Sequence, residues 1–84
     1  MQNTEIRIGV VGIVINEPKE SAAEINAILS DFSDIVVGRM GIPHRNGGAS
    51  VIALTVEGTT DQIGAMTGKL GQLRGVSVKS AIAK

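Results

Sequence analysis

Hydrophobic residues follow two different periods along this chain, and together they predict four strands and two helices without a linker between them. Strands are expected over residues 6–15, 35–42, 50–56 and 76–82, which are rich in β-branched side chains. The first of these segments is apolar at both alternating sets of positions, as is typical of a central strand covered on both faces. The last one alternates more cleanly, which is typical of an edge strand.

Two further stretches place their hydrophobic residues three and four positions apart, as the buried face of an amphipathic helix requires. Pro18 suits a first helical turn, while Ser21 followed by Glu24 matches a capping box, so the first helix is expected to begin anywhere from 17 to 21. The Thr-Thr-Asp-Gln segment 59–62 fits a capping box for the second helix. The expected buried stripes are Ala22, Ile25, Leu29 and Phe32, with Ile28 beside them, and Ile63, Met66, Leu70 and Leu73.

The segment 43–48 separates the second and third strands, and its Asn46-Gly47 pair is a strong signal for a hairpin turn. The predicted element order is therefore βαββαβ. This is an α+β, ferredoxin-like sandwich, in which an antiparallel four-stranded sheet carries two helices on one face. The first and third strands become central and the other two become edges. We expect residues 1–84 to form this single domain.

Two helices on one face leave the other face of the sheet uncovered in a monomer. The first strand offers two candidate sets of side chains for that bare face, namely Val11, Ile13 and Ile15 or the opposite set. A contiguous apolar face is an association surface. A chain of 84 residues without cysteine also lacks the disulfides that stabilise many small domains. We therefore expect a homo-oligomer, a dimer or a tetramer, with Val11 and Ile13 at the interface.

Three glycines interrupt the second predicted helix. Gly64, Gly68 and Gly71 are four and three residues apart, so they form one stripe away from the buried face. Each costs about 1 kcal/mol relative to alanine inside a helix. Close approach of a neighbouring protomer or a ligand is a physical reason for such a stripe, which makes Gly64 and Gly68 candidate interface residues. The alternative is a helix that ends early, near Gly68.

Composition excludes several classes of function. Eight Lys and Arg balance eight Asp and Glu, and Phe32 is the one aromatic residue, so direct nucleic-acid binding is not expected. With no cysteine and one histidine, we expect no metal and no cofactor. No apolar stretch approaches the roughly 20 residues of a membrane span, and we expect a cytoplasmic protein. The chain shows no arrangement of nucleophile, base or phosphate-binding loop, so we expect no enzymatic activity.

Candidate binding residues gather at one end of the predicted sheet. Arg39, His44 and Arg45 bring two or three hydrogen-bond donors together there. Charged donors of this kind bind carboxylates and phosphates, so these residues are the candidate site for a small anionic ligand. The alternative is a solvated hairpin in which Arg39 lays its aliphatic stem along the sheet.

Several stretches resemble a known family. They are RIGVVGIV at 7–14, VGRMGIP at 37–43, and GTTD at 58–61 followed by TGKL at 67–70. The chain resembles the iron-only hydrogenase system regulator family over nearly its whole length. That family is grouped with ACT-like domains, near the C-terminal domain of the nickel-responsive repressor. The resemblance implies an ACT-like fold, oligomeric assembly and a regulatory role in an iron-only hydrogenase system. It does not imply nickel, because the repressor uses several histidines and a cysteine, whereas this chain has one histidine and no cysteine.

We therefore expect a non-enzymatic regulatory domain that forms a homo-oligomer and senses a small ligand at a subunit interface. Binding there would let the ligand shift assembly by mass action. The alternative is a structural adaptor that docks a partner, such as a regulatory protein, through its sheet face or an edge strand. A retained small molecule distinguishes the two. A small enzyme is a third class, and turnover that depends on Arg39 or His44 would reveal it.

Overall fold

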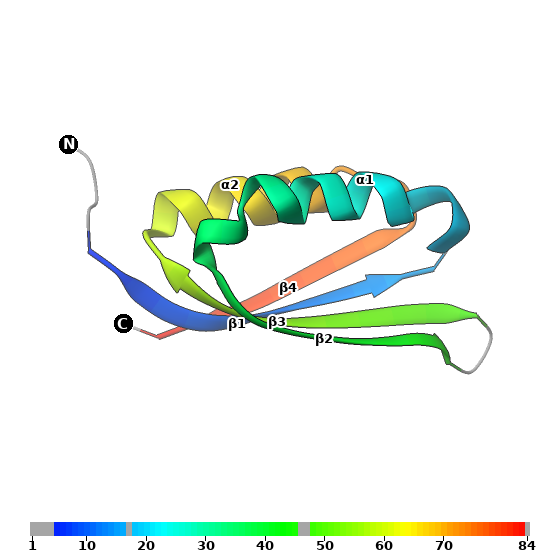
Figure 1. The fold of residues 1–84 in the computed structure, drawn as a ribbon, viewed down its shortest axis with the longest axis horizontal. Helices are drawn as coiled ribbons and strands as arrows, with labels where there is room; N and C mark the ends of the chain where they lie inside the picture. Colours follow the sequence, from blue (N-terminus) through cyan, green and yellow to red (C-terminus); the bar gives the residue numbers. More distant parts are fainter. Residues whose placement is uncertain (1–4, 17, 46–47, 84) are drawn as a thin grey trace.

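The computed structural model describes residues 5–16, 18–45 and 48–83, and it confirms the predicted order of elements (Figure 1). Two strands separate the helices along the chain, and a short 3-10 turn at Ser33–Ile35 follows the first helix. The elements are β1 (Arg7–Ile15), α1 (Pro18–Asp31), β2 (Val36–Arg45), β3 (Ala49–Gly58), α2 (Thr60–Gly71) and β4 (Val76–Ile82).

The four strands form one sheet in the order β2-β3-β1-β4, and each neighbouring pair is antiparallel. Both helices lie on the same face of this sheet, and no described helix or strand covers the other face (Figure 1). The chain therefore has the predicted α+β ferredoxin-like architecture, with β1 and β3 in the centre and β2 and β4 at the edges. Neither described helix is both long and apolar enough to cross a bilayer.

The core lies between the helices and the sheet. β1 contributes Val11 and Ile13, both 0% exposed, and Ile15 beside them. The placement of Val11 and Ile13 at a subunit interface is therefore wrong, because the helices of their own chain already cover them. The opposite set on β1 faces the bare side instead. The other core residues are Ile25 and Leu29 of α1, Ile35, Leu54 and Val56 of β3, and Ile63, Met66 and Leu70 of α2.

The two helix starts differ in how well local sequence predicts them. At α2 the predicted capping box is confirmed, since Thr59 Oγ1 accepts from the Gln62 backbone N–H at 3.1 Å and Gln62 Oε1 accepts from the Thr59 N–H at 2.9 Å. At α1 the helix begins at Pro18, within the predicted range of 17 to 21, and Ser21 lies inside the helix instead of capping it. Ser21 is buried within the helix, where its hydroxyl donates to the Arg74 carbonyl oxygen at 3.3 Å. Packing against the chain before β4 thus takes the hydroxyl that a cap would have used.

The β2–β3 hairpin is longer than predicted. β2 continues to Arg45 and β3 begins at Ala49, so both strands extend into the segment expected to be loop. The Asn46-Gly47 turn signal lies outside the described residues. The pairing of β2 with β3 shifts register between Ile42 and Arg45, around Pro43. An edge strand tolerates this proline, since its missing N–H leaves no partner strand unpaired.

Candidate functional site

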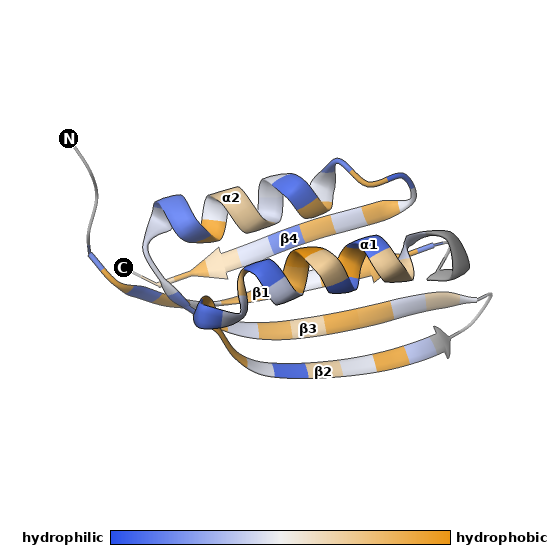
Figure 2. Ribbon diagram, turned by 45° about the horizontal axis from the view of Figure 1, so that its top comes forward, coloured by the Kyte–Doolittle hydropathy of each residue, from blue (hydrophilic) through white to orange (hydrophobic). Residues whose placement is uncertain are grey.

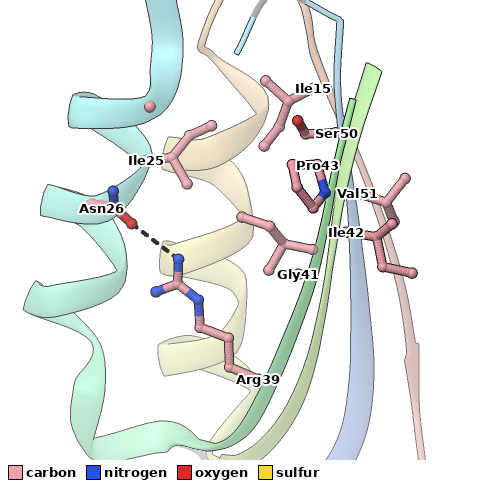
Figure 3. Close-up of a pocket in the computed structure, with 11 residues that line it drawn as sticks. Ile15, Ile25, Asn26, Arg39, Gly41, Ile42, Pro43, Ser50 and Val51 are labelled. Carbon is pink, nitrogen blue, oxygen red and sulfur yellow. Dashed lines mark hydrogen bonds between the residues drawn. The ribbon is translucent and has the colours of Figure 1, made fainter. Parts of the chain in front are cut away.

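A cavity of about 320 Å³ opens on the helix side of the sheet, between α1 and the strands β2 and β3 (Figure 3). Its walls are mainly apolar, and Ile15, Ile25, Gly41, Pro43 and Ser50 face one another across it. Ile42 and Val51 also line it, but Figure 3 shows their side chains pointing away, toward the opposite face of the sheet. Ala22, Asn26, Arg39 and Ile52 complete the lining.

The cavity exists because β2 lies outermost in the sheet and carries a glycine where a side chain would fill the space. Gly41 pairs with Ile52, which pairs in turn with the buried Ile13, so all three positions face the helices. A Cβ added at Gly41 would meet the Ile52 Cγ1 and the Val51 carbonyl oxygen at 4.0 Å, which is ordinary contact. Packing within the chain therefore does not require a glycine here.

Arg39 stands at the edge of this cavity, two residues before Gly41 on the same side of β2. Its Nη2 donates a hydrogen bond to Asn26 Oδ1 of α1 at 3.0 Å (Figure 3). The same two residues also line a second cavity of about 340 Å³, formed with Leu29, Ser30, Ser33 and Val36. Among the described residues that line the two cavities, none is acidic. The guanidinium thus meets a neutral amide and no counter-charge from the cavity walls.

The other two candidate binding residues, His44 and Arg45, have their backbone at the end of β2. Their side chains lie outside the described part of the structure, so their joining Arg39 in one site stays a prediction. Within the described residues, no three His, Asp or Glu side chains gather as a metal site would require.

The second candidate surface is the bare face of the sheet, termed the open face. The register brings five large hydrophobic side chains onto it from β1 and β2, the two strands that flank β3, and Figure 2 shows hydrophobic colouring along parts of both strands. They are 39% to 64% exposed and lie on one face of the sheet, where they form an exposed apolar surface. The five residues are Ile8, Val10 and Val14 of β1 and Met40 and Ile42 of β2.

Two small residues form the centre of the open face. Gly12 pairs with Ala53 of β3, and Met40 of β2 pairs with Ala53 in turn. A Cβ on Gly12 would meet only the Lys79 carbonyl oxygen at 3.9 Å, so nothing within the chain demands a glycine there. Small side chains flanked by larger ones leave a shallow groove that another sheet can approach closely.

The glycine stripe of α2 is exposed. The helix runs on to Gly71, so an early end near Gly68 is wrong. Apart from the neighbouring backbone of α2 itself, no described atom lies within 4 Å of a Cβ built on Gly64 or Gly68, so no other described segment approaches them. Contact with a neighbouring protomer stays a prediction.

Replacing both glycines by alanine tests that contact. The double variant Gly64→Ala, Gly68→Ala should raise the free energy of unfolding by about 1–2 kcal/mol, because each alanine relieves the cost of a helical glycine and meets no neighbour. If the stripe is an interface, the variant should also associate more weakly. Thermal unfolding followed by circular dichroism, with the mass measured at the same concentration, reports both. Greater stability with an unchanged mass would remove Gly64 and Gly68 from the interface.

Sequence reasoning found Arg39 but missed its partner Asn26 and the cavity itself. One signal was available for Gly41, since strand alternation places it on the same side as Arg39. No comparable signal marked Asn26, which follows a buried isoleucine on α1 and meets β2 only through the packing of helix on sheet.

The comparisons with known proteins agree with the fold. Residues 7–80 match a family model described as "TM1266-like: Iron-only hydrogenase system regulator, putative". The chain belongs to this family. It is 35% identical to the uncharacterized protein TM1266 from Thermotoga maritima, with a TM-score of 0.89 over 95% of this chain and 100% of that one. No protein with a curated description matches the sequence.

More distant structures share the fold alone. The C-terminal domain of the MgtC protein from Mycobacterium tuberculosis is 11% identical, with a TM-score of 0.67 over 99% of this chain and 94% of that one. CPII, a nitrogen regulatory PII-like protein from Thiomonas intermedia K12, is 11% identical, with a TM-score of 0.54 over 95% of this chain and 94% of that one. That CPII structure was bound to ADP, AMP and bicarbonate.

Proposed function

We propose that this chain is a non-enzymatic regulatory domain that self-associates through the open face and responds to a small anionic ligand. Membership of a family described as regulators of an iron-only hydrogenase system supports the regulatory role. The observation that carries the proposal is the open face, where five large hydrophobic side chains are exposed on β1 and β2, on either side of β3.

A second copy of the same chain is the occupant that the open face fits best. Two sheets pack face to face about 10 Å apart when the side chains between them interdigitate. The open face has a groove at Gly12 and Ala53, with Val10 and Val14 forming ridges beside it. In a dimer with two-fold symmetry, the ridges of one copy can pack into the groove of the other. Burial of these side chains would add apolar contacts to the small core that a chain of 84 residues can form alone.

Ligand response is supported by the Arg39 guanidinium at the edge of an apolar cavity whose described lining residues include no acidic side chain. A ligand that binds one assembly state better than the other shifts the equilibrium between them by its difference in affinity. Binding at or near a subunit interface would give this protein such a difference, and a partner regulatory protein could then recognise the assembled state.

The alternative is a structural adaptor that docks another protein without a small ligand. Its supporting observation is the pair of edge strands, since β2 and β4 each pair with one neighbour among the described residues. An extended segment of a partner could add to such an edge through backbone hydrogen bonds.

Native mass spectrometry of untagged protein, purified without added metal, tests the proposal. We expect a mass that is a multiple of the 8.7 kDa chain, with a small adduct that is lost on denaturation. An oligomer that carries no adduct after incubation with cell extract favours the adaptor. A single-chain mass at micromolar concentration contradicts self-association and with it the proposed function.

A further inference from the structure

We propose that the cavity between α1 and β2 binds a small carboxylate with a short apolar body, and that the carboxylate replaces Asn26 as the partner of Arg39. This inference rests on the proposed ligand response, for which it names the class of ligand and the contact that ligand changes.

The lining of the cavity argues for an apolar body. Ile15, Ile25 and Ile52 line it from three different elements. Pro43 closes one side (Figure 3). Its volume of about 320 Å³ lies at the lower end of the range of small-molecule sites, which is roughly 300–1,000 Å³. A branched aliphatic group of a few carbons suits this lining, because such a group has no polar atom that needs a hydrogen-bond partner.

The charge at the edge of the cavity argues for a carboxylate. A guanidinium offers a planar fork of N–H donors, which two carboxylate oxygens fill better than the single amide oxygen of Asn26. Among the described lining residues, Arg39 is the only cation, and this single fork suits a monoanion better than a phosphate. None of those residues is acidic, so an ammonium group next to the carboxylate would lack an ionic partner.

The Arg39–Asn26 bond lies where the two cavities meet, and it joins α1 to the outermost strand. A ligand whose carboxylate binds Arg39 would therefore break the Arg39–Asn26 hydrogen bond between strand and helix. Met40, the next residue of β2, lies on the open face. A shift of β2 on ligand binding would therefore move Met40 on the surface proposed for self-association.

Protein-detected NMR with 4-methylpentanoate as the probe tests the cavity directly. We expect saturable shifts of the backbone amides of Gly41 and Ile52 and of the side-chain amide of Asn26. The neutral isostere 4-methylpentanamide should bind about tenfold more weakly or worse, because it loses the charge-assisted hydrogen bonds. Leucine, which adds an ammonium to the same skeleton, should also bind several-fold more weakly.

Four variants separate the cavity from a general effect of charge. Arg39→Gln should reduce the affinity for the acid to that for the amide. Asn26→Asp should weaken binding about tenfold with Arg39 intact, because an internal carboxylate then occupies the guanidinium. Gly41→Val should abolish binding by filling the cavity, since nothing in the chain opposes a Cβ there. Gly38→Val, on the same strand but the opposite face, is the control and should bind like the wild type.

Equal affinities for the acid and the amide, or wild-type binding by Asn26→Asp, would overturn the inference. The titration is repeated on Val10→Lys, a variant designed to dissociate the open face. The cavity opens on the helix side of the sheet, whereas Val10 lies on the opposite face, so this variant should still bind the acid. Loss of binding in Val10→Lys would contradict the inference. A wild-type protein that assembles but shows no shifts with the acid would also contradict the inference, while the proposed self-association would still stand.

Discussion

Replacing Gly9 by alanine should destabilise this domain by about 1–3 kcal/mol, lowering its melting temperature by roughly 10 °C. Gly9 lies on the helix side of β1, where it pairs with Ile82 of the neighbouring strand β4. A Cβ built there falls 2.5 Å from the Ala81 carbonyl oxygen and 2.9 Å from the Ile82 Cα. Because both of these atoms are backbone, the methyl group can be accommodated only by moving β1 and β4 apart. Circular dichroism is the suitable probe, since the chain has no Trp or Tyr.

Gly41→Ala is the matched control for this prediction. It is also a strand glycine on the helix side, but its added methyl group would meet atoms no closer than 4.0 Å. It should leave the melting temperature unchanged or raise it slightly, since alanine restricts the unfolded chain. Similar losses in both variants would mean that strand glycines matter here for a reason other than crowding at β4.

Replacing Val10 by lysine should reduce the assembly to single chains of 8.7 kDa. Val10 is 53% exposed on the open face, so in an isolated chain the lysine can extend into water at little cost. Between two packed sheets the same ammonium would lose its hydration without a partner, which costs several kcal/mol. We expect the dissociation constant of the assembly to rise about 100-fold or more, as measured by sedimentation with interference optics.

Ala27→Lys serves as the control for added charge. Ala27 is exposed on α1, away from the open face, so this variant should keep the mass of the wild type. The far-ultraviolet spectrum of each variant shows whether the chain remains folded. A folded Val10→Lys variant that keeps the wild-type mass would place the contact between copies elsewhere on the molecule.

The element order, the central position of β1 and most of the two helix stripes follow from sequence because each has a local cause, although Ala22, predicted to be buried, is exposed. Ile63, Met66 and Leu70 lie on one helical face whatever surrounds them, and Thr59 with Gln62 closes its cap within four residues. Right-handed connections then leave little choice of topology. Local patterns of this kind survive folding because tertiary packing does not oppose them.

Which side of β1 is buried could not be predicted in the same way. The set with Val11 and Ile13 and the set with Val10 and Val14 are equally apolar, so alternation alone does not distinguish them. The choice depends on where the two connections place the helices relative to the pleat of the strand. The start of α1 has a similar explanation, because the tertiary bond from Ser21 to Arg74 outweighs a local cap.

The candidate site was predictable only in part. Arg39 was identified from its charge within a strand, whereas the cavity depends on the absence of a side chain at Gly41 and on the distance between α1 and β2. Neither of these is encoded by periodicity. The site therefore emerges only when helix and sheet are placed together, and Asn26 becomes meaningful only as the residue that Arg39 reaches.

The central claim is that copies of this chain associate through the open face, and isotope-filtered NOE spectroscopy tests it most directly. In a mixture of labelled and unlabelled chains, we predict intermolecular NOEs to the methyl groups of Val10, Val14, Met40 and Ile42. Methyl groups of the core, such as those of Leu54 and Met66, should show none. Intermolecular NOEs confined to α2 or to the edge of β4, or none from a sample that sediments as single chains, would contradict the account.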